Sequence, residues 1–174
     1  MKILGIDPGY ERLGIAVLEK PARPLGGNKS NEKSFNKIQD REKVLFSECL
    51  RTPASLEFSE RLSLIGKEIK KTIKKFKPDI LAIETLFLNT NQKTVMRVAE
   101  TRGVIIYEAS LAGLKIFEAS PPQIKMAVTG YGKANKEQVM KMVKILARAD
   151  KSKTSDDELD AIAIALTAFA HIRF

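Results

Sequence analysis

Residues 3–17 read ILGIDPGYERLGIAV, and this stretch decides the fold because it contains two apolar runs joined by a turn at Pro8-Gly9. Runs at residues 2–7 and 12–19 predict a buried β-hairpin. The charged side chain of Asp7 ends the first run. Burying an unpaired carboxylate is costly, so Asp7 needs a partner. The stretch leaves three candidates open: a turn-capping hydrogen bond, a basic side chain or a metal ion.

Composition limits the class of protein. A chain of 174 residues fits one domain. Lys and Arg number 30 against 21 Asp and Glu, and the net charge of +9 favours a polyanionic partner, most often a nucleic acid. The single cysteine, Cys49, and the single histidine, His171, argue against an internal disulfide and a zinc site. The chain shows no signal peptide and no apolar run long enough to span a bilayer, so we expect a cytoplasmic protein without a membrane partner.

The segment from residue 20 to residue 43 differs in composition from the rest of the chain. It is rich in Pro, Gly, Asn, Ser and Lys and lacks apolar periodicity, so it predicts a flexible basic insertion within a single domain of residues 1–174. Its basic side chains allow contact with a phosphate backbone, and a solvated tether is the alternative.

After this segment, apolar spacing predicts alternating strands and helices. Strands are expected at residues 44–51, 79–84 and 115–119, and helices at 62–76, 94–112, 121–130, 135–149 and 155–171. Together with the hairpin, this order predicts an α/β domain with a mixed sheet and helices on its faces.

Two further acidic side chains interrupt apolar segments. Glu84 ends the strand-like run LAIE, and Asp160 lies within the apolar part of the last expected helix. In that helix, Ser155 and Glu158 have the spacing of a capping box, and acids in a first turn favour the positive end of the helix dipole. This structural explanation does not account for Asp160.

The spacing of the acids predicts metal chemistry. Asp157 and Asp160 are three residues apart, so their side chains can converge on one helix face, where like charges repel unless a cation lies between them. Oxygen ligands alone suit Mg²⁺ or Mn²⁺. Two such ions about 4 Å apart can activate water and stabilise the leaving oxygen of a phosphodiester. A basic protein with such a cluster is expected to be a nuclease, although each acid alone has an alternative as a cap or ion-pair partner.

Five motifs, in this order over essentially the whole chain, resemble the Holliday-junction resolvase RuvC family of the ribonuclease H-like superfamily: ILGIDPG, PDILAIETLF, RVAETRGV, IKMAVTGYGKANKEQV and DELDAIAIAL. The resemblance implies a ribonuclease H-like mixed five-stranded sheet flanked by helices. It also implies a homodimeric, Mg²⁺-dependent endonuclease of recombination and repair that nicks four-way DNA junctions symmetrically. The implied cofactors are two Mg²⁺ ions per site, with Mn²⁺ as a substitute. The implied partner is the RuvA–RuvB branch-migration complex.

The resemblance assigns roles to individual residues. The family's acidic tetrad matches Asp7, Glu84, Asp157 and Asp160, and the neighbouring Asp156 leaves open which of the two adjacent acids binds metal. Phe87 matches an aromatic residue at the junction crossover, with burial in the core or the dimer interface as the alternative. Lys125 and Lys136 match DNA-binding positions and Lys133 lies near them, where ammonium groups can contact phosphates.

Other proteins share parts of this pattern. Actin-type ATPases have the same core and an Asp-x-Gly turn, but they need two lobes and about double this length. A ribonuclease H or a RuvX-like nuclease of other specificity would share the acids without the LAIETLF and DELDAIAIAL segments. A non-catalytic junction-binding protein is expected if the four acids do not meet.

Overall fold

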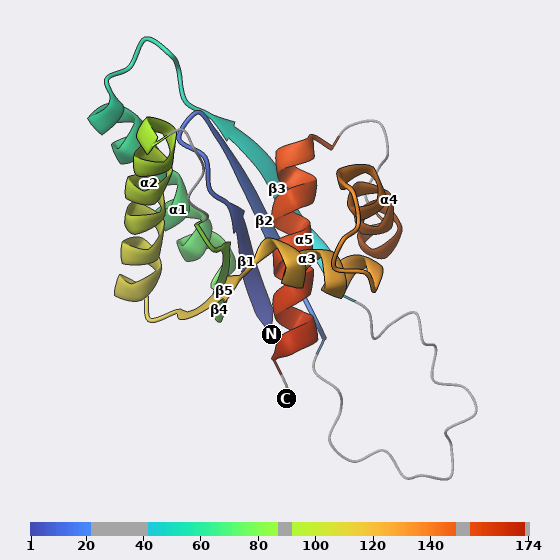
Figure 1. The fold of residues 1–174 in the computed structure, drawn as a ribbon. Coiled ribbons are helices and arrows are strands. Elements are labelled where there is room, and N and C mark those ends of the chain that lie inside the picture. The colour runs from blue at the N-terminus through green and yellow to red at the C-terminus, as the bar shows by residue number, and fades with distance from the viewer. Residues whose placement is uncertain (22–41, 87–91, 149–153, 173–174) are drawn as a thin grey trace, which may run out of the picture.

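One five-stranded mixed sheet organises the chain in the computed structural model, which describes residues 1–21, 42–86, 92–148 and 154–172. Phe87 and most of the predicted insertion lie outside the described residues. The strands lie in the order β3-β2-β1-β4-β5 (Figure 1), and β1 pairs antiparallel with β2 and parallel with β4. Their bounds are β1 Lys2–Asp7, β2 Arg12–Glu19, β3 Lys43–Arg51, β4 Ile80–Glu84 and β5 Lys115–Ala119.

The predicted helices are all present, which confirms the α/β class with helices on both faces of a mixed sheet. Their ends differ from the predicted ones by a few residues at most. The bounds are α1 Phe58–Phe76, α2 Gln92–Leu111, α3 Pro121–Thr129, α4 Lys136–Ala147 and α5 Asp156–His171.

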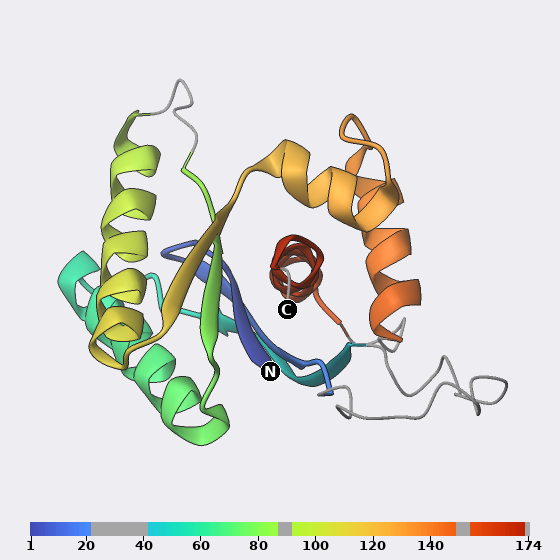
Figure 2. The same ribbon diagram turned by 90° about the horizontal axis from the view of Figure 1, so that it is seen from below.

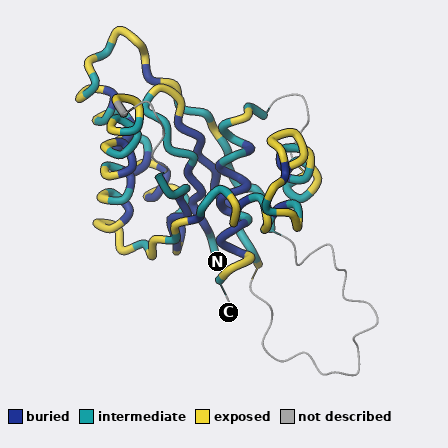
Figure 3. The backbone as a smooth tube through the Cα atoms, in the orientation of Figure 1, coloured by how far each residue is buried: buried dark blue, intermediate teal, exposed yellow. Residues whose placement is uncertain are grey.

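The sheet separates two layers of helices (Figure 2). Alternate strand residues face opposite sides, because the side-chain period of a strand is two. Ile3 and Ala16 pack in the cluster that includes α3, α4 and α5, whereas Leu4 and Ile15 pack in the cluster that includes α1 and α2. Figure 3 shows the strands as largely buried chain, with buried stretches also in the helices on both sides of the sheet.

Local signals in the sequence set the helix ends. Lys77 ends α1 in the left-handed conformation, with φ 49°, and Pro78 follows it. At the start of α5, the Ser155 hydroxyl accepts from the backbone amide of Glu158 and the Glu158 carboxylate accepts from the amide of Ser155. This reciprocal pair is the predicted capping box, and it fixes where the acidic first turn of α5 begins.

Helix α5 lies directly on the hairpin, and two glycines make that approach possible. A Cβ added at Gly5 would lie 2.3 Å from the Ala161 carbonyl oxygen, and one added at Gly14 would lie 2.1 Å from the Asp157 carbonyl oxygen. Side chains larger than hydrogen at either strand position would push α5 away from the sheet. The position of the acids on α5 relative to β1 therefore depends on these contacts.

We expect Gly5→Ala to lower the free energy of unfolding by about 2 kcal/mol, because overpacking of a tight core costs about 1–3 kcal/mol. Urea unfolding followed by circular dichroism measures the change. Gly132→Ala is the control, since its Cβ would make only ordinary contacts, at 3.6 Å or more, in the turn before α4. The control should change the free energy of unfolding by less than about 0.5 kcal/mol. Equal effects of the two substitutions would contradict the close-approach explanation.

Within the described ranges, no helix combines the length and the apolar character that crossing a lipid bilayer requires.

Candidate active site

Two of the predicted acids meet because their strands are parallel neighbours. Ile6 on β1 is in register with Ile83 on β4, so Asp7 and Glu84 follow at the same edge of the sheet. Helix α5 packs along the face of the β1–β2 hairpin, and its first turns lie near this end of the sheet and add Asp160. These three carboxylates line one pocket together with Lys125 of α3 and Lys136 of α4, and its remaining wall is formed by Pro121, Ile124, Val139 and Ile164.

Burial and mutual repulsion raise the pKa of all three carboxyl groups. Burial first, and then the charges of Asp160, Glu84 and Asp157, raise the pKa of Asp7 to about 7. The pKa of Glu84 is raised by burial and by Asp160, and that of Asp160 is also raised, mainly by burial. A cation bound among the three carboxylates would offset this repulsion and favour their ionised forms.

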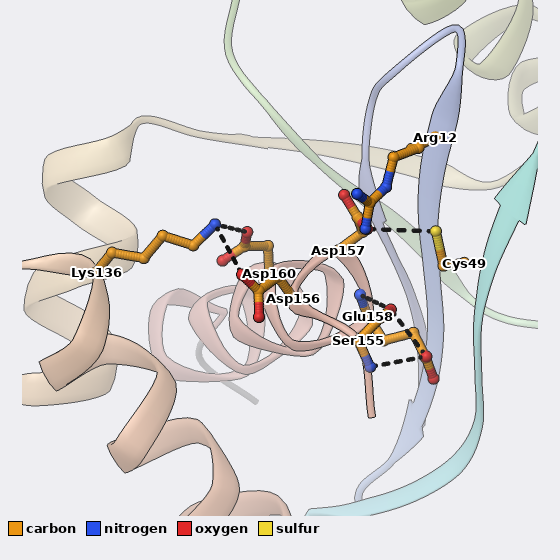
Figure 4. A network of polar contacts seen from close by, with 8 residues as sticks. All are labelled: Arg12, Cys49, Lys136, Ser155, Asp156, Asp157, Glu158 and Asp160. Carbon is orange, nitrogen blue, oxygen red and sulfur yellow. Dashed lines mark hydrogen bonds and ion pairs between the residues drawn. The ribbon is translucent and has the colours of Figure 1, made fainter. Parts of the chain in front are cut away.

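Lys136 supplies part of that positive charge. Its Nζ lies 3.7 Å from an Asp160 carboxylate oxygen and 3.6 Å from one of Asp156 (Figure 4). The charge of Lys136 lowers the pKa of both Asp7 and Asp160, and Asp160 in turn raises the pKa of the Lys136 ammonium. Because Lys136 is largely exposed, these ion pairs contribute little to stability.

The structure does not bring Asp157 into the pocket, although the three-residue spacing predicts that it converges with Asp160. Its carboxylate accepts a hydrogen bond from the Arg12 guanidinium, and the Cys49 thiol lies 3.3 Å from the same oxygen (Figure 4). This tertiary ion pair determines where the side chain points. Asp157 nevertheless lies near enough for its charge to raise the pKa of Asp7 and of Asp160.

A buried arginine supports the Glu84 strand end from the opposite side. Arg102 of α2 donates to the Glu84 carbonyl oxygen, and its guanidinium lies 2.6 Å from a carboxylate oxygen of Glu118 on β5. Its positive charge also lowers the pKa of Glu84. Arg102 therefore fixes the backbone at Glu84 and partly offsets the effect of burial on the Glu84 carboxyl.

The donor set fits a divalent cation. Asp7, Glu84 and Asp160 offer only carboxylate oxygens to one pocket, and such oxygens are the ligands that Mg²⁺ and Mn²⁺ prefer. As the side chains lie, no group of three acidic, cysteine or histidine residues in the described ranges forms a ready metal cluster. Arg12 and Lys136 are the ion-pair partners of Asp157 and Asp160, two of the carboxylates that a cation would use.

The predicted DNA-contact residues fall in three places. Lys125 and Lys136 line the pocket, whereas Lys133 lies exposed in the turn between α3 and α4. Phe87 belongs to residues 87–91, which are outside the described part of the chain.

Sequence reasoning missed Arg12 and Arg102. A signal existed for Arg102, because it precedes the buried Ile105 and Ala109 by three and seven residues and so shares their helix face. No comparable pattern marks Arg12, whose partner is 145 residues away in the sequence.

Likeness to known proteins extends over nearly the whole chain. The family model of the crossover junction endodeoxyribonuclease RuvC matches residues 3–168. A crossover junction endodeoxyribonuclease RuvC of Thermosipho melanesiensis is 41% identical over 174 residues, which are 100% of both chains. The corresponding protein of Halothermothrix orenii is 40% identical over 166 residues, or 95% of this chain and 90% of the relative. The solved structure of Thermus thermophilus RuvC in complex with a Holliday junction substrate matches with a TM-score of 0.81 at 27% identity, covering 98% of this chain and 94% of that chain.

Proposed function

Because the chain belongs to the crossover junction endodeoxyribonuclease RuvC family, we propose that it cuts four-way DNA junctions by paired symmetric nicks during recombination and repair in the cytoplasm. The observation that carries the proposal is the pocket in which Asp7, Glu84 and Asp160 face Lys125 and Lys136. A site with acids for cations and lysines for phosphates suits hydrolysis of a phosphodiester. The similar structure of Thermus thermophilus RuvC in complex with a Holliday junction substrate supports the choice of DNA form.

Nucleases of this family are metal-dependent, and we assign the metal ligands to Asp7, Glu84, Asp157 and Asp160. Mg²⁺, with Mn²⁺ as a substitute and two ions per site, fits a set of carboxylate oxygens. When bound, such ions activate water and stabilise charge on the leaving oxygen. Asp157 is preferred over Asp156 because its charge acts on Asp7. Asp156 is exposed and near Lys136.

The other polar side chains of the site are assigned to DNA. Lys125 and Lys136 open onto the pocket, so their ammonium groups can hold the phosphate next to the carboxylates. Lys133 extends this basic surface along the turn before α4. We assign Phe87 to stacking on a base at the junction centre, in line with the family resemblance, since stacking on an aromatic ring contributes about 1–3 kcal/mol. Such contacts increase the affinity for DNA and position it, but they do not recognise the base sequence.

We propose that the enzyme is a homodimer and that α2 supplies its interface. Three large apolar side chains of α2 are more than half exposed: Met96, Tyr107 and Leu111. Contiguous exposed apolar side chains mark interaction surfaces. Sedimentation equilibrium should give twice the mass of the chain, and Leu111→Glu should shift the equilibrium toward monomer; a monomeric mass for the unmodified protein would contradict the proposal.

The RuvA–RuvB complex is the proposed partner of the dimer, and a pull-down with the purified proteins tests it.

Cleavage of three substrates tests the proposed function. A synthetic four-way junction, a linear duplex of the same sequence and an RNA:DNA hybrid are incubated with the protein, with and without Mg²⁺. We expect nicks in the junction only, at symmetric positions and only with the ion. Equal cleavage of the three substrates would favour a ribonuclease H-like or RuvX-like nuclease of other specificity. Junction binding without any cleavage would favour a non-catalytic binding protein.

A further inference from the structure

The Arg12–Asp157 ion pair joins the start of β2 to the first turn of α5, beside the pocket but outside its lining. The Arg12 side chain is 49% exposed, whereas that of Asp157 is 19% exposed. Arg12 is therefore a solvent-accessible cation that neutralises a mostly covered carboxylate. This arrangement differs from that of Lys136, which lines the pocket itself.

Both neighbours of Asp157 bind one oxygen of its carboxylate. The Arg12 guanidinium and the Cys49 thiol contact Oδ2, so a cation that binds through this oxygen competes with the guanidinium for it. Exposed ion pairs are weak, with typical strengths that correspond to about two- to fivefold in an equilibrium constant. A divalent cation, bound by several carboxylates at once, can therefore displace Arg12.

We propose that Arg12 is an exchangeable counter-ion: it neutralises Asp157 until a divalent cation takes that carboxylate, and its guanidinium then binds a DNA phosphate. The inference rests on the proposed function, because it takes Asp157 as a metal ligand. Release of the guanidinium at the rim of a phosphate-binding pocket provides a charge-assisted donor at that place. Metal binding and DNA binding are thereby coupled through one side chain, and such coupling is reciprocal.

The coupling predicts opposite effects of Arg12→Gln on the two ligands. Without the competing guanidinium, the variant should bind Mn²⁺ about two- to fivefold more tightly than the unmodified protein, as measured by isothermal titration calorimetry without DNA. In Ca²⁺, its affinity for a four-way junction should fall several-fold, and the salt dependence should correspond to about one phosphate contact fewer. In EDTA, where Arg12 stays with Asp157, its junction affinity should fall less than in Ca²⁺, and by no more than the loss of one surface charge causes. Fluorescence anisotropy measures both affinities, and a denaturing gel confirms that the DNA is intact.

Arg51→Gln is the matched control. Arg51 is the cross-strand neighbour of Arg12 on β3 and is exposed, so its loss removes the same charge from the same part of the sheet. The control should leave Mn²⁺ affinity unchanged and should weaken junction binding equally in Ca²⁺ and in EDTA, if at all. Equal effects of the two variants on Mn²⁺ affinity would overturn the proposal, because they would show that the loss of one positive charge, rather than the release of Asp157 from Arg12, changes the affinity.

Two further outcomes separate this inference from the proposed function. If the unmodified protein nicks junctions with Mg²⁺ but Arg12→Gln does not bind Mn²⁺ more tightly, the exchange is refuted and the nuclease assignment stands. If the unmodified protein binds no Mn²⁺ and cuts no junction, both are refuted. Thermal melting of each variant shows that the fold is retained, as expected for substitutions of exposed side chains.

Discussion

Asp7→Asn is expected to reduce junction nicking about a thousandfold or more while junction binding persists. Asn has the size of Asp but lacks its charge, and Asp7 is the carboxylate whose pKa responds to all three other members of the acidic set. Metal ions contribute several kcal/mol of charge stabilisation in phosphoryl chemistry, and each 1.36 kcal/mol corresponds to a factor of ten in rate. Single-turnover cleavage of a labelled four-way junction, with binding measured in Ca²⁺, gives both quantities.

Glu48→Gln provides the control for this experiment. Glu48 is an exposed carboxylate on β3 that does not line the pocket. Its substitution removes the same charge from the molecule and should leave nicking within about a factor of two, since surface substitutions have small effects. Unchanged nicking by Asp7→Asn would remove Asp7 from the metal site, and loss of junction binding would show a structural role instead.

The second large effect concerns stability and pH. The pKa of Asp7 is about 7 in the folded protein, against an ordinary value of 3.8. The folded state therefore binds a proton more readily than the unfolded state between these values, so the Asp7 contribution to stability is full below about pH 4 and is lost as pH rises to 7 and above. A difference of about three pH units corresponds to roughly 4 kcal/mol as an upper bound.

Asp7→Asn isolates this contribution, since the amide does not titrate. In EDTA at pH 8 the variant should be more stable than the unmodified protein, by up to about 4 kcal/mol, and the difference should shrink toward zero near pH 4. Urea unfolding at several pH values measures it. Mg²⁺ at pH 8 should stabilise the unmodified protein more than the variant, because ligands that bind the native state raise its stability. A pH-independent difference between the two proteins would contradict the raised pKa.

The convergence of Asp7 and Glu84 illustrates what sequence can predict. Each ends an apolar run, which the sequence shows, and the parallel pairing of β1 with β4 in the structure places both acids at one end of the sheet. Asp160 was identified as a candidate because the capping box marks the start of α5 and leaves that acid beyond the first turn. These residues were predictable because local signals determine where each segment begins and ends.

The position of Asp157 could not be predicted in the same way. Helical spacing placed it on the face of Asp160, but its side chain is directed by Arg12 and Cys49, which come from two other strands. Likewise, the carbonyl contact of Arg102 with Glu84 depends on how α2 packs on the sheet. Contacts between distant segments follow from the assembled fold, and no pattern within either segment specifies the partner.

The packing of α5 on the hairpin has a consequence for biosynthesis. Asp7 is translated well before Asp160, and the two meet only when α5 covers Gly5 and Gly14. A nascent or prematurely terminated polypeptide that stops before residue 156 contains all five strands of the described sheet but lacks α5. Translation itself therefore delays assembly of the acidic pocket until α5 is made, because Asp160 belongs to that helix.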